Sequence, residues 1–161
     1  MPNGGTTYII GNVIMQPTGS NNPAMVSYGE EGVGSRKSDL YVINNTFIND
    51  DSSRGTFVTV RNTTTPARIM NNLFSGFGDV TTQATAIKTT NYQSLAVGFV
   101  NRAAYDLRPL VTPLIINMGS PAGYSSEGMA LKAMSSYKHT ASSVARVSLG
   151  GKSDIGAYEV Q

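Results

Sequence analysis

Tyr8-Ile9-Ile10-Gly11-Asn12-Val13-Ile14 is the first of three segments that share one template, in which two apolar runs flank a central asparagine. The other two segments are 41–48 and 68–74. The aligned asparagines are Asn12, Asn45 and Asn72, which lie 33 and 27 residues apart. Self-similarity at this period is typical of proteins that stack one short structural unit on the next.

Two shorter apolar runs, 24–28 and 56–60, lie between these segments, so each period holds at least two strands. The turns between them are rich in Gly, Ser and Asn. A Greek-key sandwich would instead show clean apolar/polar alternation and two-residue hairpins, and no Asn-Gly or Asp-Gly pair lies between these strands. The pattern therefore predicts an all-β solenoid, whose coils stack Ile, Val, Leu and Phe inward.

The asparagines of the template have two interpretations. At a bend between two strands, each amide can hydrogen-bond to the asparagine of the neighbouring coil and so form a ladder. Alternatively, Asn12, Asn45 and Asn72 contact a ligand. Because their positions recur with the strands, we favour the ladder.

Composition excludes several functional classes. The chain has 161 residues with no Cys, no Trp and one histidine, His139, which rules out disulfide frameworks, cysteine nucleophiles and multi-histidine metal centres. Ser, Thr and Asn make up more than a quarter of the chain, while charged residues make up only 14%. The net charge of +2 does not indicate a nucleic-acid-binding face. Apolar runs are far shorter than the roughly 20 residues of a membrane span, so none is predicted.

The chain resembles the C-terminal part of bacterial right-handed parallel β-helix proteins of the pectate-lyase-like superfamily. The resemblance rests on the segments 10–16, 22–32, 39–47, 71–74, 105–109 and 119–122, and above all on the ending Asp154-Ile155-Gly156-Ala157-Tyr158-Glu159. It implies a right-handed parallel β-helix of about four coils over residues 1–100. Residues 101–161 would form an irregular C-terminal latch on the same domain.

The segment that follows the repeats contains three prolines and little periodicity. We expect a last strand at 97–100, a short helical turn at 126–134 with Ser125 or Ser126 as its N-cap, and an extended stretch from Tyr137 to Arg146. Asp154, Tyr158 and Glu159 would tie the chain end down through polar contacts to Arg146 or Arg108. For His139 we expect a structural role.

The resemblance implies a carbohydrate-associated protein derived from a polysaccharide lyase or glycoside hydrolase, either active or inactive in this short form. In such enzymes carboxylates and basic side chains line a groove along one face. The catalytic candidates are Glu30, Glu31, Arg36 and Asp39, and the substrate-binding candidates are Tyr28, Arg54 and Arg61. The alternative for this group is a solvated loop with surface ion pairs.

No cofactor is expected; Ca²⁺ at Asp50 and Asp51 is a weak alternative, because two adjacent carboxylates lack the spacing of a calcium loop. The other functional hypothesis is a non-catalytic, adhesin-like or carbohydrate-binding solenoid. The resemblance implies an extracellular or periplasmic location, although residues 1–5 lack the features of a secretory signal. With a strand at Tyr8 the first coil is uncapped, so we expect either a piece of a longer protein or self-association through this end.

Overall fold

The structure is a computed structural model that describes residues 1–51 and 55–160. The described part of the chain is all-β and contains no α-helix, only the 3-10 turn η1 (Arg102–Ala104). Three parallel sheets account for the first eleven strands. These strands are β1 (Thr7–Ile10), β2 (Val13–Gln16), β3 (Ala24–Tyr28), β4 (Leu40–Ile43), β5 (Thr46–Asn49), β6 (Thr56–Val60), β7 (Arg68–Met70), β8 (Leu73–Ser75), β9 (Asp79–Thr81), β10 (Ile87–Thr89) and β11 (Tyr92–Ser94).

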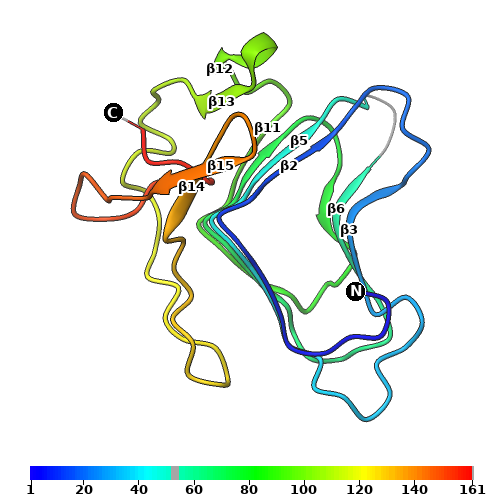
Figure 1. The fold of residues 1–161 in the computed structure, drawn as a ribbon. Helices are drawn as coiled ribbons and strands as arrows, with labels where there is room; N and C mark the ends of the chain where they lie inside the picture. Colours follow the sequence, from blue (N-terminus) through cyan, green and yellow to red (C-terminus); the bar gives the residue numbers. More distant parts are fainter. Residues whose placement is uncertain (52–54, 161) are drawn as a thin grey trace.

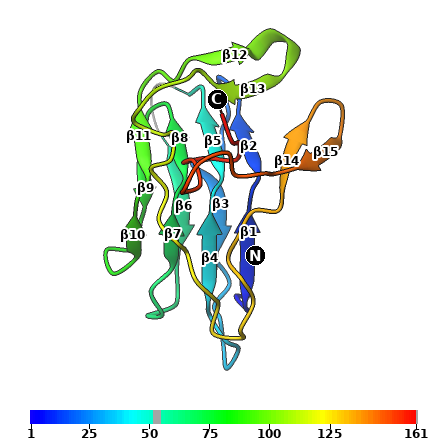
Figure 2. The same ribbon diagram turned by 90° about the vertical axis from the view of Figure 1, so that its left-hand side faces the viewer.

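The chain visits the three sheets in turn and returns to the first (Figure 1). Sheet A has the order β1-β4-β7-β10, sheet B β2-β5-β8-β11 and sheet C β3-β6-β9. One passage is called a circuit here, and Figure 2 shows how successive circuits lie side by side. The β1 end of the stack is formed by β1, β2 and β3, and the β10 end by β9, β10 and β11. The parallel pairing excludes the Greek-key sandwich and is compatible with the predicted solenoid.

The core lies between the sheets and consists of columns of equivalent residues. Phe47 stacks on Phe74 with a centroid distance of 5.1 Å, and Phe57 from sheet C meets Phe74 at 4.8 Å. All three rings are buried. Each fully buried aromatic ring removes a large apolar area from water, so these residues dominate the stability of the stack.

The predicted asparagine ladder is confirmed and has one more member. The Nδ2 of Asn12 donates to the Oδ1 of Asn45 at 3.2 Å, and that of Asn45 donates to the Oδ1 of Asn72 at 3.0 Å. Asn72 donates in the same way to Asn91, which the sequence template missed. Each Oδ1 also accepts the backbone N–H of the preceding asparagine. Because these amides are used within the ladder, the interpretation of Asn12, Asn45 and Asn72 as ligand contacts has no structural support.

The segment after β11 folds into two antiparallel hairpins, β12 (Phe99–Asn101) with β13 (Asp106–Pro109), and β14 (Ser135–Lys138) with β15 (Ser142–Ala145). The expected strand at 97–100 therefore begins at Phe99 and belongs to a hairpin outside the parallel sheets. The expected extended stretch from Tyr137 to Arg146 is wrong, because it turns back within the second hairpin.

The predicted helical turn at 126–134 is also wrong. The Oγ of Ser125 does accept the N–H of Glu127 and of Met129, as a cap would, but Gly128 adopts a φ of +81°. Tyr124 and Ala130 then form an isolated antiparallel bridge. The positive φ turns the backbone out of the helical region after a single turn.

The segment 97–160 packs on the outer faces of sheets A and B (Figures 1 and 2). On sheet A, Tyr41, Ile43 and Met70 form a buried cluster with Ala122 and Leu131. A second buried cluster lies on sheet B, where Ile48 of β5 and Leu73 of β8 pack against residues of the segment 97–160. The members from that segment are Leu107, Ile115, Ile155, Ala157, Tyr158 and Val160. These residues give the sheets two buried faces, which explains why β4 and β5 are buried at every position. Within residues 1–51 and 55–160, no helix has the length and apolar character of a membrane span.

Candidate functional site

The predicted catalytic residue Glu30 lies at the turn that follows β3. It forms an ion pair with Arg61, with 3.0 Å between Oε2 and Nε, and its Oε1 accepts a hydrogen bond from the hydroxyl of Ser27 at 2.6 Å. Both charged side chains are well exposed, so water screens the pair and its net contribution to stability is small. Of the predicted residues, the structure thus brings together Glu30 and Arg61.

The remaining predicted catalytic residues point to different partners. Glu31 is exposed, Arg36 reaches the carbonyl of Asn3 at 3.5 Å, and Asp39 accepts a hydrogen bond from the hydroxyl of Ser126 at 3.0 Å. None of them lines any of the three cavities described for this molecule. No ion pair of these three side chains is found among the described residues, so the alternative of a solvated loop with surface ion pairs matches only Glu30 with Arg61.

Of the substrate-binding candidates, Tyr28 and Arg61 are neighbours, since the N–H of Arg61 donates to the carbonyl of Tyr28 at 2.9 Å. Tyr28 is completely buried, and its hydroxyl donates to the carbonyl of Gly5 at 2.7 Å. Burial raises the pKa of Tyr28, and the charge of Asp39 raises it further, so the phenol stays neutral. Tyr28 therefore lies in the core and offers no surface to a substrate. Arg54 lies outside the described residues.

Metal binding finds no site in the described part of the chain. No group of three His, Asp or Glu side chains there is placed to hold an ion. Asp50, half of the weak calcium candidate, forms an ion pair with Arg102 of η1. The carboxylate of Asp50, which a bound cation would need as a ligand, is therefore already paired with the guanidinium of Arg102.

A hollow of about 560 Å³ lies where β13, the β14–β15 hairpin and residues 146–160 meet. Residues 146–160 are called the closing segment here. Tyr105 and His139 form part of its lining, and their rings stack with a centroid distance of 4.8 Å and an interplanar angle of 19°. The hydroxyl of Tyr137 lies 2.9 Å from the Nδ1 of His139. Because Tyr105 is 49% exposed, this pair presents an aromatic surface to solvent.

Charged side chains flank the aromatic rings of the hollow. Arg108 donates from Nε to the Oδ1 of Asp106 at 2.8 Å and from a terminal nitrogen to its Oδ2 at 2.6 Å. Hydrogen bonds from this guanidinium hold the pKa of Asp106 below its usual range. Lys138 also lines the hollow, and no ion pair to it is found within residues 1–51 and 55–160.

Burial raises the pKa of Tyr158, another lining residue, to about 12, with a further contribution from the charge of Asp106. Its hydroxyl therefore remains a neutral hydrogen-bond donor at physiological pH. The two carboxylates that line the hollow, Asp106 and Glu159, are each paired with a guanidinium. Because its lowered pKa makes Asp106 a poor proton donor, the hollow is better suited to binding than to acid catalysis by this residue.

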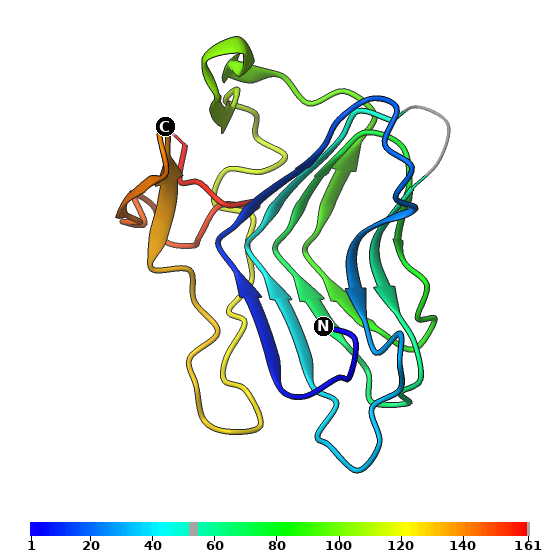
Figure 3. The same ribbon diagram turned by 45° about the vertical axis from the view of Figure 1, so that its right-hand side comes forward.

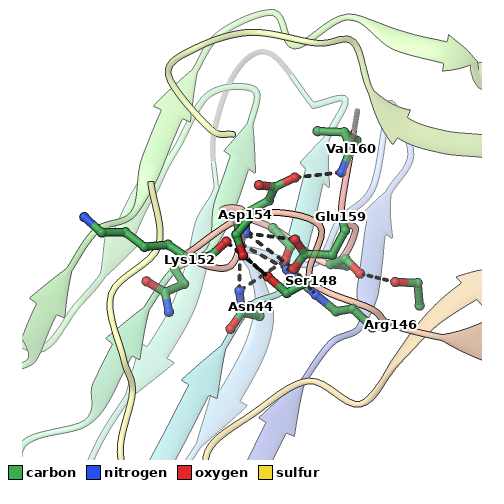
Figure 4. A network of polar contacts seen from close by, with 12 residues as sticks. Asn44, Arg146, Ser148, Lys152, Asp154, Glu159 and Val160 are labelled. Carbon is green, nitrogen blue, oxygen red and sulfur yellow. Dashed lines mark hydrogen bonds and ion pairs between the residues drawn. The ribbon is translucent and has the colours of Figure 1, made fainter. Parts of the chain in front are cut away.

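A buried network beside the hollow secures the closing segment (Figure 4), and Arg146 and Glu159 belong both to this network and to the lining of the hollow. Arg146 pairs with Glu159 at 2.7 Å, and its terminal nitrogens donate to the carbonyls of Gly156 and Asp154. The carboxylate of Asp154 accepts the N–H of Asn117 at 2.6 Å and the N–H of Val160 at 2.7 Å. The predicted polar contact to Arg146 is therefore confirmed.

Asparagines at the bends between sheets A and B also attach the segment 97–160 to the stack. Asn44, which has a φ of +52°, donates from Nδ2 to the carbonyl of Asp154 at 3.0 Å. Asn71, with a φ of +58°, bonds through its amide to the carbonyl and the N–H of Ser120. A side chain on Gly156 would place its Cβ 2.9 Å from the Oγ1 of Thr46, so glycine is needed where the closing segment touches β5. The polar groups named in this network are hydrogen-bonded or ion-paired to one another, which indicates that the network has a structural role.

Sequence reasoning missed the hollow because its residues come from three separate segments. The signals available were the aromatic residues Tyr137 and His139 close together and the charged pair beside Tyr105. Neither recurs with the repeat. Comparison with known proteins finds no matching family model, no matching curated protein and no matching solved structure.

Proposed function

We propose that the protein is a right-handed parallel β-helix that binds carbohydrate, without cleaving it, in the hollow between β13 and the β14–β15 hairpin. Three parallel sheets visited in a fixed order support the fold. The hand follows from the strong preference of parallel crossover connections for right-handedness. A relation to the pectate-lyase-like superfamily remains part of this proposal and rests on the sequence segments that resemble it.

The observation that carries the binding proposal is the exposed Tyr105–His139 stack inside a concave site. The C–H faces of a sugar ring pack against aromatic rings, and ring hydroxyls need hydrogen-bond partners at the edge. Arg108, Lys138 and the neutral hydroxyl of Tyr158 are available to supply them. The site is lined by both apolar and polar groups, as small-molecule sites usually are.

Two observations argue against cleavage at this site. The four predicted catalytic residues do not converge on a cavity, and the carboxylates of the hollow are held by guanidinium groups. An inverting or retaining glycosidase would need a pair of carboxyl groups with different protonation states on either side of the bond.

The test is a binding titration of the full chain against soluble polysaccharides, with a polyuronate and a neutral glucan as the two probes. We expect binding to at least one of them, weakened about tenfold by Tyr105→Ala, which corresponds to loss of one ring contact. Tyr124→Ala is the matched control, because Tyr124 is 69% exposed and lies outside the hollow. Full affinity in Tyr105→Ala, or no binding to either polymer, would contradict the proposal.

A further inference from the structure

A second cavity, of about 370 Å³, lies where the loop 119–133 and the closing segment meet the bends between sheets A and B. Figure 3 shows that this loop (yellow to gold) runs along sheet A and then returns beside itself. A bridge between Tyr124 and Ala130 closes the loop. The N–H of Gly119 donates to the carbonyl of Ser153 in the closing segment at 2.9 Å. Hydrogen bonds of the protein itself therefore fix the walls of the second cavity.

Positive charge without a counter-ion lines the second cavity. Lys132 of the loop and Lys152 of the closing segment are both exposed, and neither forms an ion pair within residues 1–51 and 55–160. Arg146 and Glu159 also line the cavity, but they neutralise each other at 2.7 Å, and Figure 4 shows the side chain of Lys152 extending away from this pair. Asp154 is not part of the lining, and its carboxylate accepts two backbone N–H groups. Two ammonium groups are therefore left to attract an anion.

Neutral hydrogen-bond donors belong to the same lining. The backbone N–H groups of Gly151, Lys152 and Ser153 follow one another in the closing segment, and none of them donates to a described residue. The hydroxyls of Ser120 and Ser153 also make no hydrogen bond within the described part of the chain. Backbone N–H groups and hydroxyls are the neutral donors that proteins place around the oxygens of a phosphate.

One buried residue of the lining has an acceptor without a partner. Asn44 is only 4% exposed, and its Nδ2 donates to the carbonyl of Asp154, but its Oδ1 accepts no hydrogen bond from a described residue. At the equivalent bend of the next circuit, the Oδ1 of Asn71 accepts from the N–H of Ser120 and from the hydroxyl of Thr90. A buried polar group is normally paired, so the Oδ1 of Asn44 is open to a donor that enters the cavity.

We propose that the second cavity binds a phosphate group, either as free phosphate or as a phosphate monoester with a neighbouring hydroxyl. The ammonium groups of Lys132 and Lys152 and the N–H groups of the closing segment donate to its charged oxygens. The Oδ1 of Asn44 accepts one hydrogen bond from the ligand. Free phosphate keeps a proton at neutral pH and supplies this donor itself, and in a monoester the neighbouring hydroxyl supplies it. Sulfate has a similar shape and charge but no proton to donate.

The first experiment titrates the full chain with sodium phosphate by calorimetry at neutral pH, with the ionic strength held constant by sodium chloride. We expect saturable binding that Lys132→Gln and Lys152→Gln each weaken about tenfold, because each removes one charge-assisted hydrogen bond. Lys88→Gln is the matched control, since Lys88 is exposed on β10 and is not part of the cavity. No binding, full affinity in either cavity variant, or an equal loss in Lys88→Gln overturns the proposal. Because all three lysines are exposed, we expect unchanged circular dichroism spectra.

The second experiment tests the buried acceptor by comparing sulfate with phosphate on the unaltered chain. We expect sulfate to bind at least about tenfold more weakly, because it leaves the Oδ1 of Asn44 without a donor. Equal affinity for the two anions would show that charge alone attracts them and would overturn the proposal. Glycerol phosphate distinguishes the two sources of the phosphate group. Tighter binding than free phosphate identifies a monoester as the ligand, and weaker binding identifies free phosphate.

These measurements are separate from the test of carbohydrate binding. The second cavity and the hollow share only Arg146 and Glu159, which none of the variants changes. Lys152→Gln should therefore keep the affinity of the unaltered chain for polysaccharide, and Tyr105→Ala should keep its affinity for phosphate. A loss of phosphate binding in Tyr105→Ala would place the anion in the hollow and contradict the proposal.

Discussion

The two ends of the stack differ although one repeat builds both. The inward-facing positions at the β1 end carry Ile9 and Ile14, and the equivalent positions at the β10 end carry Lys88 and Gln93. The backbone at both ends is in register with the interior. The comparison shows that the repeat specifies how circuits stack, while the residues at a few inward positions decide whether an end faces water or another apolar surface.

The largest effect is expected along the column that runs from Ile14 through Phe47 and Phe74 to Gln93. Phe47→Ala should lower the free energy of unfolding by about 3–5 kcal/mol, because it leaves a cavity in a closed core. Ile14→Ala should cost only about 1–2 kcal/mol, because the residue is partly exposed, and Gln93→Ala should cost less than about 0.5 kcal/mol. Urea denaturation measures all three. Equal losses for Phe47→Ala and Ile14→Ala would mean that the β1 end is as closed as the interior, and would contradict the difference between the two.

The asparagine ladder allows the same comparison with polar groups. Asn72→Ala removes two acceptor contacts and two donor contacts from a buried site, so we expect a loss of about 2–3 kcal/mol. Asn12→Ala should cost less than about 1 kcal/mol, since its Nδ2 donates to the carbonyl of Ile10 two residues back and its Oδ1 accepts no hydrogen bond from a described residue. The midpoint of thermal unfolding under identical conditions compares the two variants. A loss for Asn12→Ala as large as that for Asn72→Ala would contradict the difference between end and interior.

Exchanging the character of the β10 end tests whether inward residues decide association. Lys88→Ile combined with Gln93→Phe makes this end resemble the other. We expect stability to change by less than about 1 kcal/mol, because these side chains are exposed. Association should increase, because the variant presents apolar residues at both ends of the stack. Sedimentation velocity detects the larger species, and an unchanged sedimentation coefficient would show that inward residues do not control the ends.

The smallest effect concerns a contact that exists only at the β1 end, where the loop that carries Glu127 reaches Lys37 and Thr6. Hydrogen bonds from these residues lower the pKa of Glu127. A carboxylate with a lowered pKa stabilises the fold above its unfolded pKa, and this contribution is lost as the pH falls through the folded pKa. The difference in urea midpoint between wild type and Glu127→Gln should therefore be small at pH 7 and disappear towards pH 3. Glu31→Gln is the matched control, since Glu31 is exposed and has no ion pair among the described residues. A difference that persists at pH 3 would contradict this origin.

Predictability from sequence depended on whether a residue belongs to the repeat. The strands at 24–28 and 56–60 coincide with β3 and β6, and three of the four ladder asparagines were identified. Asn91 was missed because Lys88 and Gln93 interrupt the apolar template on either side of it. The polar residues that complete the β10 end are thus the ones that hid the fourth asparagine of the ladder, although about four coils were predicted.

The candidate site shows the opposite case. The charged residues chosen along one stretch of the sequence, from Glu30 to Asp39, are near in the chain but turn to different partners. The hollow joins Tyr105, His139 and Tyr158, which come from separate segments outside the repeat. No local sequence pattern predicts which of these side chains come into contact.

Periodic apolar residues and bend asparagines determined the stacking of parallel strands, because each circuit makes the same short-range choices and each bond in the ladder repeats the one before. Only the tertiary structure decided where the tail attaches. The contact between Asn44 and Asp154 spans 110 residues, and that between Thr46 and Ala157 spans 111. Such contacts occur once in the chain and depend on the completed surface of the stack, so the sequence carries no repeated signal for them.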